Sequence, residues 1–275
     1  MEGLDQTLLL KIKTGLNYHG DIFRQVVRNL LLQQIGTKLV SEELPIDRMG
    51  GVKIDLVFEK HVNGTLLDRV VLLIECKKVH SSDIKWLFLE ETNSQDITSW
   101  LARIDLNNRE SFMDRYIEDF TTKRVLDGYK LDLRKSVSED KILIKDNIED
   151  VLRQITLQFA AYFLDFAHSL NALEESTSFN ILPIIVTNAE LLIVKKYPIN
   201  RVDKNRADVS EDDLAANTEK VGYVLAKSFG NVSKTGDYVE SPSFKTLKEH
   251  AQNTNKGVYI VNVDAISKFF NEILN

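Results

Sequence analysis

The stretch VVLLIECKKV, residues 70–79, decides how this sequence is interpreted. The apolar residues at 70–74 predict a buried strand, yet they lead directly into Glu75, Cys76, Lys77 and Lys78. Successive side chains of a strand point to opposite faces, so Glu75 and Lys77 share one face while Cys76 lies on the other. The sequence therefore predicts a carboxylate and an ammonium group side by side where the strand ends.

Composition and charge limit the class of protein. The chain has 275 residues, of which 43% are hydrophobic and 28% charged, as in ordinary globular proteins. The single cysteine, Cys76, excludes an internal disulfide and a zinc site built from several thiolates. A net charge of −6 gives no overall attraction to phosphate, so contact with nucleic acid would depend on local clusters of Lys and Arg.

The sequence gives two indications of location. No run approaches the roughly 20 apolar residues that a membrane-spanning helix needs. The start, MEGLDQ, lacks the basic and apolar regions of a secretory signal. We therefore expect a cytoplasmic protein.

Periodicity before residue 79 predicts a helix and a three-strand meander. Apolar residues recur at helical spacing over 19–35, and strands are predicted over 38–46 and 53–60. Asn63-Gly64 is typical of a hairpin turn leading into the strand at 70–79. A symmetric two-residue turn there would place Asp55 opposite Leu72. A looser connection is needed to bring Asp55 opposite Glu75.

The rest of the chain predicts further helices and strands. Residues 81–135 are charged and show helical periodicity in DIKWLFLEE and RESFMDRYIEDF, which predicts a mostly helical insertion at about 81–135. Residues 148–170 form the longest amphipathic pattern, and 179–199 predict a pair of strands around an Asn-Ala turn. Ser210 is expected to cap a short acidic helix, and 257–274 predict a strand followed by a helix. This order describes one mixed α/β domain over residues 1–275.

The acidic and basic residues near the meander suggest one chemistry. Asp55, Glu75 and Lys77 would meet at the end of two antiparallel strands. Two carboxylates suit Mg²⁺, which completes its shell with water and phosphate oxygens, and the backbone carbonyl of Cys76 would be a further ligand. Lys77 would orient or deprotonate the attacking water and offset charge in the transition state. This set of residues favours hydrolysis of a phosphodiester.

A simpler interpretation is a salt-bridge cluster at the strand ends of an unrelated α/β protein. Short patterns of an aspartate followed by ExK occur by chance. Against this, Asp55 and Glu75 each lie within an apolar strand, where a charge is costly unless it is paired or coordinates a cation.

The segment KIDLVFEK…LLIECKK resembles the core of the PD-(D/E)xK, or restriction-endonuclease-like, nuclease superfamily. Asp55 matches the motif's aspartate, Glu75 its second acid and Lys77 its lysine. The resemblance implies a mixed-sheet α/β core flanked by helices, carrying the predicted helical insertion. It also implies a metal-dependent endodeoxyribonuclease that uses Mg²⁺, with Mn²⁺ as a substitute, in restriction or defence against foreign DNA.

The sequence departs from the family pattern at several positions. Ile54 stands where the motif has proline. On the first helix, members often carry a glutamate near the metal, and the best matches here are the shorter Asp21 and, one turn later, Gln25. A charge at a helix N-terminus explains Asp21 equally well. For the glutamine of the later helix, Gln154 and Gln158 both fit.

Partners follow from the same resemblance. DNA is the expected substrate, RNA stays open, and the basic residues expected to contact nucleic acid are Arg24, Arg28, Lys78, Lys195 and Lys196. Cutting both strands ordinarily needs two sites, so we expect a homodimer. The alternative function is a catalytically inactive module of the same fold that binds nucleic acid or a protein.

Overall fold

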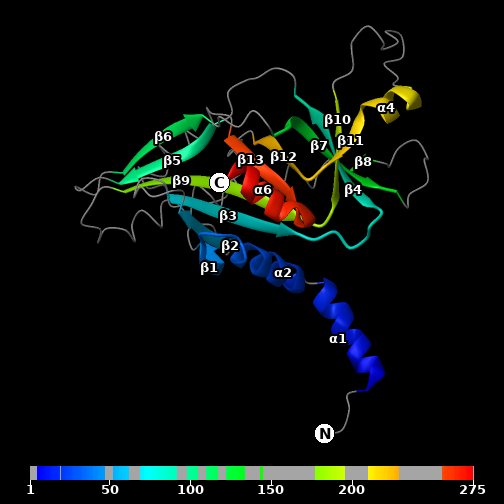
Figure 1. Cartoon of the computed structure of the whole chain (residues 1–275). Coiled ribbons are helices and arrows are strands. Elements are labelled where there is room, and N and C mark those ends of the chain that lie inside the picture. The colour runs from blue at the N-terminus through cyan, green and yellow to red at the C-terminus, as the bar shows by residue number, and fades with distance from the viewer. Residues whose placement is uncertain are drawn as a thin grey trace.

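The computed structural model describes most of the chain. The described residues are 5–18, 20–46, 52–61, 69–91, 98–104, 110–116, 122–133, 143–144, 177–195, 210–228 and 256–274. The protein is α/β, with a large mixed sheet flanked by helices (Figure 1). Within these ranges, no helix is long and apolar enough to cross a membrane.

The helices and strands fall in the following ranges. The helices are α1 (Gln6–Tyr18), α2 (Asp21–Leu32), α4 (Glu211–Asn217), the 3-10 helix η4 (Val263–Ala265) and α6 (Ile266–Ile273). The first seven strands are β1 (Thr37–Ile46), β2 (Val52–His61), β3 (Arg69–Lys77), β4 (Ile84–Glu90), β5 (Thr98–Ile104), β6 (Glu110–Tyr116) and β7 (Arg124–Asp132). The others are β8 (Leu143–Ile144), β9 (Thr177–Thr187), β10 (Glu190–Val194), β11 (Thr218–Val221), β12 (Tyr223–Ser228) and β13 (Lys256–Asn262).

The predicted meander is confirmed. Strands β1, β2 and β3 pair antiparallel in that order, and β9 lies on the other side of β3, parallel to it. His61 pairs with Arg69, so the connection between β2 and β3 is longer than a two-residue turn. As a result Leu56 stands opposite Ile74, and Asp55 and Glu75 occupy the next positions along the two strands.

The predicted helical insertion at 81–135 is wrong. The described residues of this segment form β4, β5, β6 and β7, all joined to the same sheet. In β4, exposure alternates: Ile84, Trp86 and Phe88 are buried while Lys85 lies at an intermediate position. Charged residues between the apolar ones suggested a helix, but β4 is held by β7 and β10, which lie far away in the sequence.

The remaining predictions have mixed outcomes. Ser210 caps α4 by accepting a hydrogen bond from the Asp213 amide at 3.1 Å, and the closing strand and helix are β13 and α6. The strands at 179–199 exist as β9 and β10, but they do not pair with each other: β10 pairs with β4 and β11. The amphipathic pattern at 148–170 lies outside the described residues. Helix α1 and strands β11 and β12 were not foreseen.

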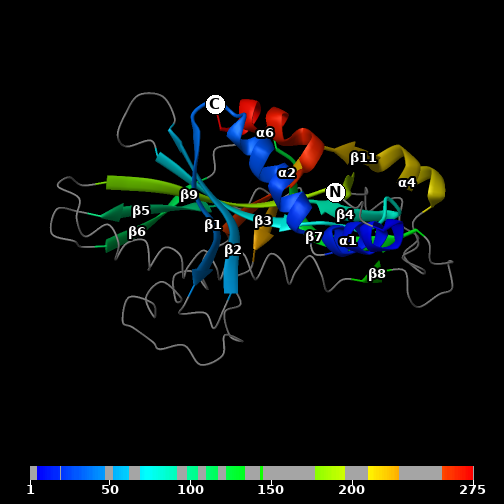
Figure 2. The same cartoon turned by 90° about the horizontal axis from the view of Figure 1, so that it is seen from below.

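Two apolar clusters hold the sheet. On one face α2 and α6 lie side by side (Figure 2), and Phe23, Val27 and Phe269 pack against buried residues of β2, β3, β9 and β13. The other cluster joins β4, β10, β12 and β13. Each fully buried side chain of this size contributes about 1.5–3 kcal/mol. The meander is thus fixed from one side by two helices that are distant in sequence.

Gly222, between β11 and β12, provides a test of this packing. A Cβ atom at Gly222 would stand 2.7 Å from the Cβ of Ala265 in η4, whereas a Cβ at Gly15 in α1 would meet nothing within 4 Å. We expect Gly222→Ala to lower the free energy of unfolding by about 1–3 kcal/mol. Gly15→Ala, the control, should leave it unchanged or raise it by up to about 1 kcal/mol. Urea unfolding of both variants measures the difference, and equal effects would contradict the close approach.

Candidate functional site

Asp55 lies where the pairing of β2 with β3 ends. The last backbone pair is Leu56 with Ile74, and beyond it the Asp55 side chain replaces the backbone as acceptor. Its Oδ2 accepts a hydrogen bond from the Cys76 amide at 2.7 Å. The carboxylate is thereby fixed beside the β3 residue that separates Glu75 from Lys77.

Glu75 and Lys77 form the predicted pair on one face of β3. Lys77 Nζ donates to Glu75 Oε1 at 2.7 Å, and the Glu75 side chain is only 6% exposed while that of Lys77 is 30% exposed. Parallel pairing with β9 places Lys77 beside Thr187. The structure therefore brings Asp55, Glu75 and Lys77 together at one end of β2 and β3, as the sequence predicts.

Asn188 fixes the chain just after the site. Its Oδ1 accepts from the Val79 amide at 2.6 Å, and its Nδ2 donates to the Val79 carbonyl at 3.0 Å. This side-chain amide extends the β3–β9 ladder beyond the strand ends. The backbone around Lys77 is consequently held on both sides.

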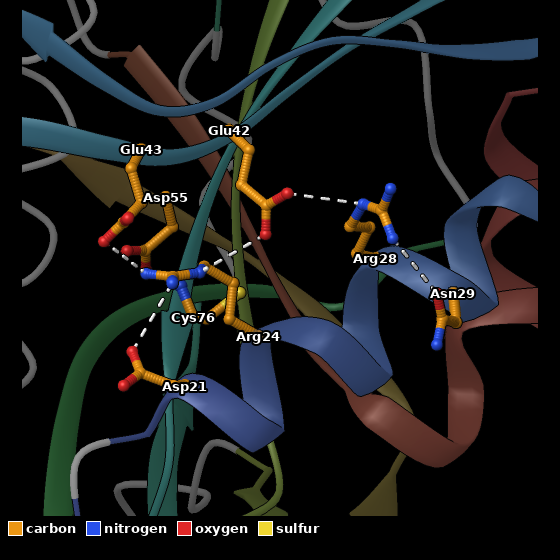
Figure 3. Close-up of polar contacts among 8 residues, drawn as sticks. All are labelled: Asp21, Arg24, Arg28, Asn29, Glu42, Glu43, Asp55 and Cys76. Atoms are coloured by element: carbon orange, nitrogen blue, oxygen red, sulfur yellow. Dashed lines mark hydrogen bonds and ion pairs between the residues drawn. The ribbon is translucent and has the colours of Figure 1, made fainter.

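A guanidinium group lies next to Asp55 (Figure 3). Arg24, on α2, contacts Glu43 at 2.8 Å, Asp21 at 3.4 Å and Glu42 at 3.7 Å, and its side chain is 16% exposed. Glu42 and Glu43 come from β1, so this group of ion pairs joins α2 to the edge of the meander.

Glu43 has an unusual backbone. Its φ is 50°, the left-handed region that residues other than glycine rarely adopt, although it lies within β1. Its neighbours Glu42 and Leu44 pair with Leu56 and Ile54, which puts Glu43 opposite Asp55. The strained conformation accompanies a side chain that reaches Arg24.

Burial and charge set the protonation of the site. Burial raises the pKa of Asp55, and the Glu43 carboxylate adds to this, while the Cys76 amide, Lys77 and Arg24 oppose it. Burial also raises the pKa of the Cys76 thiol well above its usual range, and the carboxylates of Asp55 and Glu75 raise it further. The thiol is therefore neutral at physiological pH, so Cys76 is poorly suited to act as a nucleophile or as a thiolate ligand.

The donor set fits Mg²⁺ better than a softer metal. In the described part of the chain, no group of three or more Asp, Glu, His or Cys side chains is arranged to hold a metal ion. Mg²⁺ does not need one, because it binds through one or two carboxylates and keeps several waters. Asp55 and Glu75 are the two carboxylates predicted for this role, and they stay a prediction, as does the Cys76 carbonyl as a third oxygen.

The accessory residues and the predicted contacts to nucleic acid have different surroundings. Asp21 is in the first turn of α2 and pairs with Arg24, whereas Gln25 is exposed. Arg28 pairs with Glu42 at 3.4 Å. Lys78 directly follows β3.

Of the remaining predicted residues, only Lys195 lies within the described ranges. Lys195 follows β10 and pairs with Glu219 of β11 at 3.3 Å, so the structure does not join it to the Asp55 group. Gln154, Gln158 and Lys196 lie outside the described residues.

Sequence reasoning missed Glu42 and Glu43. They are adjacent acids inside the predicted strand at 38–46, where a half-buried strand would alternate apolar and polar residues. That break in alternation is the signal that could have identified them. Their partner, Arg24, is predicted from the sequence as a contact to nucleic acid, and its pairing with these acids is not visible in the sequence.

Comparisons of the chain with protein-family models, with curated proteins and with solved structures gave no match.

The raised pKa of Asp55 predicts a pH-dependent stability. The folded chain holds this proton more tightly than the unfolded chain, so stability is lost as pH rises from the ordinary carboxyl value of 3.8 through the folded pKa. Asp55→Asn keeps the shape and removes the charge. Without added metal we expect it to melt higher than the parent at neutral pH, and the difference to shrink in acid.

Thermal melts across pH in EDTA measure this effect. The control is Asp212→Asn, on an exposed residue of α4, which should change the melting temperature little. If Asp55→Asn melts below the parent at neutral pH, the charge of Asp55 stabilises the fold, and the salt-bridge interpretation gains support.

Proposed function

We propose that this chain is a divalent-metal-dependent nuclease that hydrolyses phosphodiester bonds of DNA. One observation carries the proposal. The Asp55 carboxylate accepts a hydrogen bond at 2.7 Å from the backbone amide of Cys76, which lies between Glu75 and Lys77, and the Lys77 ammonium donates to Glu75 at 2.7 Å. Two carboxylates and one ammonium group converge there from two neighbouring strands.

The order of elements supports a restriction-endonuclease-like core. Helix α2 precedes the antiparallel meander β1–β2–β3, and β9 returns beside β3 in parallel. A parallel return needs a long crossover, here occupied by residues 78–176 of the chain. The resemblance in the sequence predicts this same order of helix, meander and later strand.

Each residue has a distinct part in the proposed reaction. Asp55 and Glu75 would hold Mg²⁺, which when bound supplies a Lewis acid for the phosphate and for the attacking water. The Cys76 amide fixes the Asp55 carboxylate, so that side chain needs little reorganisation on binding. Burial of Glu75 keeps solvent from screening its charge.

Lys77 is proposed to act on the nucleophile and on charge in the transition state. An ammonium group has three donors, and only one is needed for Glu75 Oε1. The others are available to orient a water molecule or to donate to a phosphate oxygen. Lys77 thus contributes mainly to the chemical step, whereas Asp55 and Glu75 contribute to metal binding.

The wider setting belongs to the same proposal. A role in restriction or defence against foreign DNA, Mn²⁺ as a substitute metal, a cytoplasmic location and a homodimer all follow from the family resemblance. Arg28 and Lys78 are the proposed contacts to phosphate. Arg24 is poorly placed for that role, because three carboxylates surround it and only 16% of its side chain is exposed.

A second candidate is the catalytically inactive module. Glu75 is already paired with Lys77 and Asp55 with a backbone amide, which is what a structural cluster also requires. The two candidates differ in their response to a metal ion: only the nuclease needs one to act.

Cleavage assays separate these candidates. The purified protein should degrade plasmid, linear or single-stranded DNA with Mg²⁺ or Mn²⁺ and not with EDTA, and Asp55→Asn should abolish degradation. Mg²⁺ should also raise the melting temperature of the parent but not of Asp55→Asn, because it binds only the folded parent. DNA binding without cleavage under every condition would favour the inactive module.

Lys77 and Lys78 form a matched pair for the chemical step. Lys77→Gln keeps a hydrogen-bond donor for Glu75 but loses the charge, so we expect at least about a hundredfold loss of cleavage rate. Its Mg²⁺ affinity should stay equal or increase, because a positive charge beside the cation is removed. Lys78→Gln should bind DNA somewhat more weakly, by the loss of one phosphate contact, but should cleave bound DNA at nearly the parent rate. The face assignment would be wrong if Lys78→Gln were the inactive variant.

A further inference from the structure

Arg24 is an internal cation at the edge of the proposed metal site. Its guanidinium lies beside the Asp55 carboxylate (Figure 3), and Glu43, which binds this guanidinium at 2.8 Å, stands opposite Asp55 on the neighbouring strand. In this position the guanidinium opposes the rise that burial causes in the pKa of Asp55. The same group is held by Glu43, Asp21 and Glu42, and only 16% of its side chain is exposed. A charge so poorly solvated acts strongly on a neighbouring carboxylate.

We infer that Arg24 is the resident counter-ion of Asp55 and sets the affinity of the site for a divalent cation. This inference rests on the proposed function, because it concerns the same metal site. Without metal, Arg24 offsets part of the charge on Asp55. A divalent cation bound at Asp55 repels the guanidinium, so the repulsion is subtracted from the binding free energy.

The three carboxylates around Arg24 can hold it when a metal ion takes its place beside Asp55. Glu43 holds Nη1 at 2.8 Å, and Asp21 and Glu42 lie at 3.4 Å and 3.7 Å from other nitrogens of the group. They come from α2 and β1, so Arg24 keeps acidic partners when a metal takes Asp55. We call Asp21, Glu42 and Glu43 the carboxylate cradle.

Arg28 provides a matched comparison. It lies one turn after Arg24 on α2 and contacts Glu42 of the cradle at 3.4 Å, but the guanidinium beside Asp55 is that of Arg24 (Figure 3). Replacing Arg28 by Gln lowers the net charge by one, as Arg24→Gln does, but leaves the Arg24 guanidinium beside Asp55.

Calorimetric titration with Mg²⁺ tests the inference without any activity measurement. We expect Arg24→Gln to bind Mg²⁺ roughly tenfold more tightly than the parent, a change of about 1.4 kcal/mol. Arg24→Lys keeps the charge and should bind like the parent, and Arg28→Gln should change the affinity less than about twofold, because Coulomb energy falls with distance and is screened.

The Mg²⁺-dependent rise in melting temperature should follow the same order. An unchanged affinity in Arg24→Gln, or an equal gain in Arg28→Gln, overturns the role of Arg24 while leaving the metal site in place. If the parent binds no Mg²⁺ at all, the metal site fails and the inference fails with it.

Glu43 gives an independent test that does not require Arg24→Gln to fold. Its side chain is 47% exposed, so Glu43→Gln should fold normally. With one cradle carboxylate neutralised, Arg24 stays closer to Asp55, and Mg²⁺ should bind several-fold more weakly. An unchanged affinity overturns the role of the cradle.

The double variant, Glu43→Gln with Arg24→Gln, shows whether Glu43 acts on the metal through Arg24 or directly by its own charge. If Glu43 acts through Arg24, Glu43→Gln changes Mg²⁺ affinity in the parent but little in the Arg24→Gln background. An equal effect in both backgrounds shows that Glu43 acts by its own charge and overturns the cradle.

Discussion

The register of β2 against β3 is the constraint on which the site depends. Leu56 stands opposite Ile74, so the next residues of the two strands are Asp55 and Glu75. A shift by one residue would turn the side chains of one strand to the other face. It would also move buried Leu56 and Ile74 out of the cluster covered by α2 and α6. The apolar packing that stabilises the sheet therefore also fixes where the acids meet.

The negative charge of Asp55, which a metal site needs, lowers the stability of the folded chain. The surroundings that bury this carboxylate raise its pKa, so its charged form costs free energy in the folded chain. The structure offsets part of that cost with the Cys76 amide, Lys77 and Arg24, and Glu75 is offset by Lys77. A buried acid whose charge carries a net cost, as at Asp55, is a pattern expected of functional sites.

Helix α2 takes part in the site as well as in the core. One side of α2 contributes Phe23, Val27 and Leu31 to the apolar cluster. Arg24, on the same helix, reaches the acids of β1. Packing of α2 against the sheet thus places the guanidinium beside Asp55, and this linkage joins the electrostatics of the site to the position of the helix.

The sequence by itself determined the elements that rest on local chemistry. The helical spacing of α2, the strands of the meander, the Ser210 cap and the alternation of Glu75 with Lys77 could all be inferred from neighbouring residues. It also suggested that Asp55 and Glu75 would be close, because a hairpin brings consecutive strands together.

Tertiary structure decided what depends on residues far apart in the chain. The stretch at 84–90 is a strand because β7 and β10 hold it on both sides, although its local pattern favoured a helix. Strands β9 and β10 follow each other but pair with different partners, and Arg24 meets Glu42 and Glu43 only after α2 has packed on the sheet. Backbone pairing and ion pairing act between groups near in space, and distance in space is fixed only when the whole sheet has formed.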